Sequence, residues 1–196
     1  MKATNLSTSI GHRSHNATTP TAVLRHEHEV ILRALALLEK LGAELEGGRP
    51  VDRKTLEWLV GFFKTFTDRC HHGKEEQHLF PTLEQHGVPK QGGPLGVLLA
   101  EHEEGRALVR TIATEEGRHA AEAINHYVAL LRGHIDKENE VLFPMAEDIL
   151  SAEKQGTLLQ AFEKVEQEVA GADVHERLET ELVRLEQNTR GPVLHS

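Results

Sequence analysis

One eleven-residue pattern occurs twice in this sequence, at 71–81 and at 134–144. Both copies begin with histidine, carry lysine and glutamate at the fourth and fifth positions, and end in Leu-Phe-Pro. Each copy follows a Glu-His-Glu triplet, at 27–29 and at 101–103. A match of this length rarely arises by chance. The repeat therefore predicts that both strings lie on helices that contribute side chains to one shared centre.

Apolar residues recur at spacings of three and four along four stretches, which is typical of amphipathic helices in a bundle. The first helix is expected to begin at Thr19-Pro20, with threonine as N-cap and proline in the first turn. The other three are expected at about 52–86, 95–116 and 118–150, separated by segments rich in Gly and Pro. Long helices joined by short connections predict an all-α, up-down-up-down four-helix bundle.

The chain divides into four parts by composition. Residues 1–18 are polar and without periodicity, which predicts a disordered N-terminal arm. Residues 19–150 form the predicted bundle. Residues 151–189 show weaker helical patterning broken at 171–173, which predicts a C-terminal helical extension packed on the bundle, and 190–196 form a tail. Aromatic residues make up only 4% of the chain, which leaves little room for a sheet.

Charge and cysteine content exclude several classes of partner. Acidic residues outnumber basic residues 31 to 22, so the formal charge is -9 and the surface should repel nucleic acid. The single cysteine, Cys70, allows no internal disulfide. The sequence starts without the apolar run of a secretory signal, and no stretch reaches the roughly 20 apolar residues of a membrane span. We therefore expect a cytoplasmic protein without a membrane partner.

The repeated histidines and glutamates have the spacing of metal ligands. A histidine and a glutamate four residues apart lie on one helical face, about one turn from each other. Two such pairs, together with one histidine from each of the other two helices, suit iron, manganese or zinc, and two carboxylates favour a dinuclear site. The predicted ligands are His28, His71, Glu75, His102, His134 and Glu138.

The position of each candidate on its helix separates it from its neighbours. His28 continues an apolar stripe, whereas His26 lies about 200° round the helix and points to solvent. The same analysis favours His71 and Glu75 over the adjacent pair at positions 72 and 76. The alternative is that these are ordinary core or surface histidines. Burying six ionisable groups without a metal would cost several kcal/mol each, which argues against that interpretation.

Four further residues stay open as contributors or as packing. His78 lies one heptad after His71 and is a possible ligand or supporting group, as is Glu76. Tyr127 lies one heptad before His134, where its hydroxyl could reach the site, but ordinary packing is as good an explanation. Cys70 is interpreted as a buried small side chain.

The doubled His-x-x-x-Glu with Leu-Phe-Pro resembles the hemerythrin-like, histidine-histidine-glutamate cation-binding family, over approximately 22–149. The resemblance implies a four-helix bundle holding two non-heme irons, bridged by oxygen (oxo or hydroxo) and by the carboxylates of Glu75 and Glu138. It also implies that the protein binds dioxygen or responds to oxygen, iron, nitric oxide or peroxide stress.

The chain departs from the oxygen-carrying hemerythrins at two points. Those proteins carry a second histidine one turn from the equivalent of His102, where this chain has Leu98 and Arg106. They also carry an aspartate where this chain has Asn139, one position after Glu138. A missing imidazole leaves more open metal positions, which favours redox turnover over reversible oxygen storage.

Three functions are consistent with the sequence. The first is a di-iron protein that binds dioxygen or a related small molecule, in oxygen or iron sensing or in a stress response. The second is a di-iron enzyme that removes peroxide or nitric oxide. The third is a regulatory module whose C-terminal helices, 152–187, engage a protein partner, although stabilisation of the bundle is the better explanation for those helices.

Overall fold

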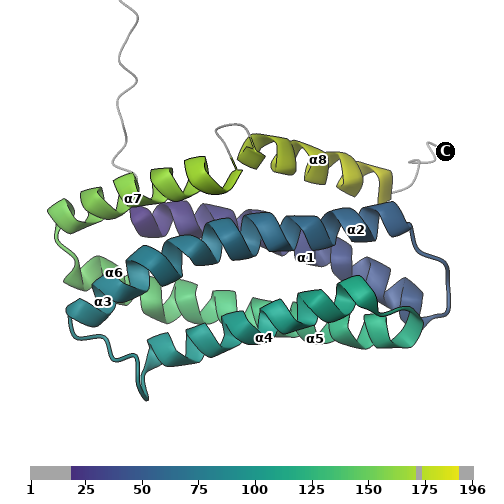
Figure 1. Cartoon of the computed structure of the whole chain (residues 1–196), viewed down its shortest axis with the longest axis horizontal. Coiled ribbons are helices and arrows are strands. Elements are labelled where there is room, and N and C mark those ends of the chain that lie inside the picture. The colour runs from purple at the N-terminus through teal and green to yellow at the C-terminus, as the bar shows by residue number, and fades with distance from the viewer. Residues whose placement is uncertain (1–18, 171–173, 190–196) are drawn as a thin grey trace, which may run out of the picture.

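A computed structural model of the chain describes residues 19–170 and 174–189, and within these ranges the ordered elements are all helical (Figure 1). The predicted arm 1–18, the break at 171–173 and the tail 190–196 lie outside the described residues. The elements in chain order are α1 (Pro20–Glu46), α2 (Arg53–Phe62), η1 (Phe63–His72), η2 (Glu75–Leu79), α3 (Phe80–Gln85), α4 (Pro94–Thr114), α5 (Gly117–Lys137), η3 (Glu138–Leu142), α6 (Phe143–Ile149), α7 (Ala152–Ala170) and α8 (Val174–Thr189).

Four rods form the bundle and confirm the predicted all-α class. The first is α1, the second runs from α2 to α3, the third is α4, and the fourth runs from α5 to α6 (Figure 1). The predicted start of the first rod is also confirmed, because the Thr19 side chain accepts a hydrogen bond from the Ala22 backbone N–H. Asp52 caps the second rod in the same way through Lys54.

The second and fourth rods contain π-helical segments that the sequence did not predict. These are η1 and η2 in the second rod and η3 in the fourth. A π-helical turn is closed by a bond between residues five apart, so it widens the helix and changes which side chains share a face. The leucine of each Leu-Phe-Pro string is the last residue of such a segment, and the helix continues through Pro81 and Pro144 rather than ending there.

Apolar side chains fill the bundle in two clusters, one toward each end. On α1, Leu24 belongs to one cluster and Ile31 to the other, and His28 lies between them. A belt of buried polar residues therefore crosses the bundle between the two clusters. The arrangement gives this belt a rigid, water-poor surrounding on both sides.

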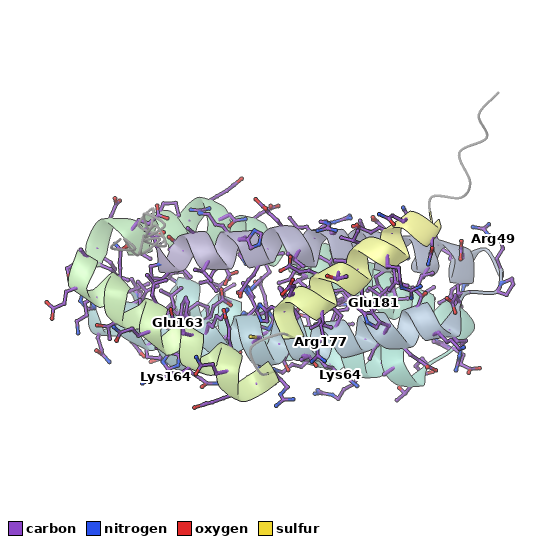
Figure 2. All side chains as sticks on the ribbon, turned by 90° about the horizontal axis from the view of Figure 1, so that it is seen from above. Arg49, Lys64, Glu163, Lys164, Arg177 and Glu181 are labelled. Carbon is purple, nitrogen blue, oxygen red and sulfur yellow. The ribbon has the colours of Figure 1, made fainter. Side chains whose placement is uncertain are left out.

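The helices α7 and α8 lie across the outside of α1 and the second rod (Figures 1 and 2). Their apolar faces are buried against the bundle, while Glu163 and Lys164 of α7 and Arg177 of α8 project from the surface in Figure 2. The buried side chains of these helices are Leu158, Phe162, Val165, Leu182 and Leu185. Among the described residues, no helix is long and apolar enough to cross a membrane.

Candidate metal centre

The six predicted ligand residues meet in the buried belt. Each is at most 1% exposed, although all six carry ionisable side chains. His28 comes from α1, His71 and Glu75 from the second rod, His102 from α4, and the remaining pair from the fourth rod. The structure thus brings together residues that are up to 110 positions apart in the sequence (28 to 138).

The four imidazoles turn their Nε2 atoms toward the two carboxylates. Glu138 Oε2 lies 3.2 Å from His28 Nε2 and 3.3 Å from His134 Nε2. Glu75 places one oxygen 3.6 Å from His71 Nε2 and the other 3.5 Å from His102 Nε2. Glu75 therefore lies between the histidine of its own rod and the histidine of α4.

Each imidazole is held from behind by a hydrogen bond from Nδ1 to an oxygen acceptor. The four pairs are His28 with Asn139 (3.0 Å), His71 with Glu27 (2.9 Å), His102 with Glu76 (2.7 Å) and His134 with Glu101 (3.0 Å). A carboxylate can only accept, so Nδ1 carries the proton in at least three of the rings, and in the neutral rings Nε2 presents a lone pair.

These lone pairs face one another without a donor between them. His28 Nε2 lies 3.0 Å from His71 Nε2, and His102 Nε2 lies 3.1 Å from His134 Nε2. The four carboxylate oxygens of Glu75 and Glu138 also lack a hydrogen-bond donor and are fully buried. Such a group of acceptors is costly unless protons or cations fill it.

The pKa shifts show how protons would fill the site in the absence of metal. Burial, together with the charge of Glu138, raises the pKa of Glu75 well above its ordinary value. Burial also disfavours ionisation of Glu138, but the positive charge of nearby His134 lowers its pKa well below the ordinary value. Burial opposes the charged form of His134, yet Glu138 and Glu101 raise its pKa to about 9. A divalent or trivalent cation would replace these protons.

His72 is a seventh member of the belt, which the sequence analysis wrongly set aside. It is 4% exposed, and its ring stacks on that of His102 with centroids 3.8 Å apart. An α-helix rotates by about 100° per residue, which would place His71 and His72 on different faces. This rotation does not hold in the π-helical η1, where both side chains turn inward. Both ring nitrogens of His72 lack a hydrogen-bond partner among the described residues.

The seven residues form two groups, and within each group the possible ligand atoms lie within 4.8 Å of one another. Glu75 belongs to both groups. The first group, called group A here, is His28, His71, Glu75 and Glu138. The second, called group B, is His72, Glu75, His102 and His134. Group B thus contains three imidazoles, those of His72, His102 and His134.

Two Lys-Glu pairs support the histidines, and the sequence analysis did not assign them a role. Lys74 donates to Glu27, which accepts from His71, and Lys137 donates to Glu101, which accepts from His134. The sequence repeat already contains both pairs. The lysine is part of the repeated string, and the glutamate precedes the histidine in each Glu-His-Glu triplet. Burial disfavours ionised Glu27, but the bond from His71 and the Lys74 charge lower its pKa to about 2.

The repeated phenylalanines cover the histidines of the opposite repeat. Phe143 stacks on His28 with ring centroids 5.4 Å apart, and Phe80 stacks on His102 at 5.8 Å. Each Leu-Phe-Pro string thus closes the apolar side of the belt. The residue after each glutamate follows the same rule, since Asn139 holds His28 and Glu76 holds His102.

The open candidates are resolved by position. Glu76 holds the outer face of His102 and is salt-bridged to Arg106, so it does not face the centre. His78 and Tyr127 belong to neither group. Cys70 is buried, which raises the pKa of its thiol to about 12, and its Sγ lies 2.9 Å from Nε2 of His175 on α8. His175 is only partly exposed, and its ring also packs on Phe66.

A buried belt of histidines and glutamates between four helices defines a class of cation-binding bundle. The sequence matches the hemerythrin HHE cation binding domain over residues 19–146, which is most of the chain. The protein therefore belongs to the hemerythrin HHE cation-binding family.

Curated relatives share this region at moderate identity. An uncharacterized protein of Mycobacterium tuberculosis is 28% identical over 159 residues, covering 76% of this chain and 61% of the relative. The iron-sulfur cluster repair protein YtfE of Salmonella newport is 38% identical over 131 residues, covering 60% of this chain and 56% of the relative. The chain thus spans about three fifths of the length of these relatives. No solved structure matches significantly.

Proposed function

We propose that the belt holds two iron ions, one in group A and one in group B. His28 and His71 would hold the first ion, and His72, His102 and His134 would hold the second, with the carboxylates of Glu75 and Glu138 available to the pair. The family resemblance implies that these carboxylates and an oxygen would link the two ions. The observation that carries the proposal is the convergence of four Nε2 atoms on two buried carboxylates without a donor in reach. Imidazole with carboxylate is a ligand set suited to iron.

The iron pair would supply reversible binding and reduction of small oxygen or nitrogen species. The residues of this chain keep the pair in place. The Nδ1 bonds fix the ring orientations, and the carboxylates behind them raise the basicity of the ligands. The two phenylalanines and the apolar clusters exclude water, which strengthens every charge interaction inside the belt.

We infer that the protein binds dioxygen or a related small molecule in sensing or in a stress response. The alternative is an enzyme that removes peroxide or nitric oxide. The similarity to an iron-sulfur cluster repair protein supports a stress-related role for either form. The missing histidine of α4 was the argument for turnover, and His72 offers group B a third imidazole in its place, so we rank binding ahead of turnover. The packing of α7 and α8 on the bundle favours a stabilising role over the partner-binding role.

Metal content and the absorption spectrum of freshly purified protein test the iron proposal. We expect about two irons per chain and the charge-transfer bands of an oxygen-bridged pair. Zinc as the only metal would contradict it. Turnover of hydrogen peroxide or nitric oxide by the iron-loaded protein, lost in His71→Ala and Glu138→Ala, would favour the enzyme; its absence favours the binding protein.

A further inference from the structure

A cavity of about 190 Å³ lies beside the B group, between the second rod, α4 and α5. His72 lines it, and so do Phe63 and Tyr127, whose rings meet edge to face at 5.0 Å. A water molecule occupies about 30 Å³ in the liquid, so this space holds a molecule of a few heavy atoms with little solvent.

The walls of the cavity are apolar near its floor. Phe63, Val109 and Gly105 contribute no hydrogen-bonding side chain there. Tyr127 is the exception, because burial and the nearby Asp68 charge raise the pKa of its phenol, which keeps its proton and can donate. His72, whose ring nitrogens have no hydrogen-bond partner among the described residues, also lines the cavity.

Three cations line the same cavity, although the chain as a whole is acidic. Arg106 is salt-bridged to Asp68, Glu76 and Glu103. Lys64 and Arg110 are exposed and make no salt bridge with any residue in the described part of the chain. Figure 2 shows Lys64 at the margin of the bundle, pointing away from its centre. Asp68 is the only carboxylate among these lining residues, and its Oδ1 accepts a hydrogen bond from Arg106 Nε at 2.7 Å.

We propose that this cavity is the binding and access site for a small monoanion of two to four heavy atoms, with oxygen or nitrogen acceptors, that approaches the B group past His72. The unpaired cations attract the anion, the apolar walls select for small size, and the phenol of Tyr127 donates to it. The inference rests on the proposed iron pair as the destination, but the cavity binds the anion through this chain's own residues.

Azide is the probe, and Gly105 is the residue that closes the cavity. A Cβ at Gly105 would lie 3.5 Å from Tyr127 Cε2, which is an ordinary contact, so Gly105→Ala fits and Gly105→Leu fills the space. Gly61 is an exposed helical glycine with nothing within 4 Å of a Cβ, so Gly61→Leu is the matched control. In the iron-loaded protein, stopped-flow absorption measures the azide association rate.

We expect Gly105→Leu to slow azide association at least tenfold, Gly105→Ala to give a smaller decrease, and Gly61→Leu to match the parent. The double substitution Lys64→Ala, Arg110→Ala should slow association several-fold at low salt and leave it unchanged at high salt, because salt screens exposed charges. An unchanged rate in Gly105→Leu, with iron content retained, would overturn the proposal.

A metal-free measurement separates this inference from the iron proposal. Azide titrated into the metal-free protein should shift the backbone amide signals of Gly105 and Val109 in nuclear magnetic resonance spectra, and Gly105→Leu should abolish the saturable shift. Saturable shifts in a protein that takes up no iron would support the cavity and reject the iron pair. Absence of shifts in a protein that does take up two irons would reject the cavity and leave the iron pair standing.

Discussion

The two repeats build the same lysine-glutamate-histidine chain in different surroundings. In the first repeat, Lys74 is fully buried and is shared between Glu27 and Glu166 of α7. In the second, the side chain of Lys137 is 45% exposed and has Glu101 as its partner. The sequence signal is nearly identical, so the difference comes from the C-terminal helices, which cover only the first repeat.

This cover gives a symmetric motif an asymmetric environment. Group A is sealed by α7 and α8, whose Phe162 places its ring beneath Lys74 and whose His175 contacts Cys70. Group B borders the cavity and holds a histidine, His72, that has no counterpart in the other repeat, where Ile135 occupies the position. The two groups therefore differ in their surroundings, although the repeated string is nearly the same.

The largest expected effect comes from the carboxylate that both groups share. Glu75→Leu should abolish binding of both irons, because it removes a ligand from each group and leaves the lone pairs of His71 and His102 without a bridge. The metal-free variant should be more stable than the parent by about 1–3 kcal/mol, since a buried unpaired carboxyl is lost. Mass spectrometry for metal and urea unfolding measure the two effects. Retention of one tightly bound iron would break the assignment of Glu75 to both groups.

The second prediction compares the two lysines directly. Lys74→Met should reduce the free energy of unfolding of the metal-free protein by about 3–5 kcal/mol, because it leaves Glu27 buried without a cation. Lys137→Met should cost no more than about 1 kcal/mol, because its ion pair is solvent-screened. Urea denaturation gives both values. Equal losses in the two variants would show that the cover by α7 has no energetic consequence.

The sequence predicts the helices and six residues of the belt because both depend on local rules. Caps at Thr19 and Asp52 and a period of 3.6 residues set the rods. His72 was not predicted to lie in the belt, because that period does not hold in η1 and nothing in its local sequence marks a π-helical turn. Lys74 could have been predicted, because the lysine recurs in both copies of the eleven-residue string. Glu166 and His175 reach the site through tertiary packing of α7 and α8, which lie outside both copies.

The third prediction concerns the acceptors behind the histidines. A carboxylate, Glu76, holds His102 of group B, whereas an amide, Asn139, holds His28 of group A. Glu76→Gln replaces this carboxylate by an amide, as at Asn139. The affinity for one of the two irons should fall about 10- to 100-fold. The control is Glu103→Gln, since the Glu103 side chain also pairs with Arg106, whereas Glu76 is the carboxylate that accepts from the His102 ring. Competition with a chelator resolves the two affinities, and equal weakening of both irons would argue against separate groups.

The smallest expected effect tests the contact between α7 and the sealed repeat. Glu166→Gln keeps an oxygen that accepts from Lys74, so Glu27 alone must neutralise the ammonium, and the half-exposed site limits the loss to about 1 kcal/mol or less. Glu163→Gln is the matched control, because Glu163 lies exposed on the same helix (Figure 2). Amide hydrogen exchange detects such small losses as faster local opening. Faster exchange confined to α7 and η1 is expected in Glu166→Gln and not in Glu163→Gln, since Glu166 accepts from Lys74, whose other acceptor Glu27 holds His71.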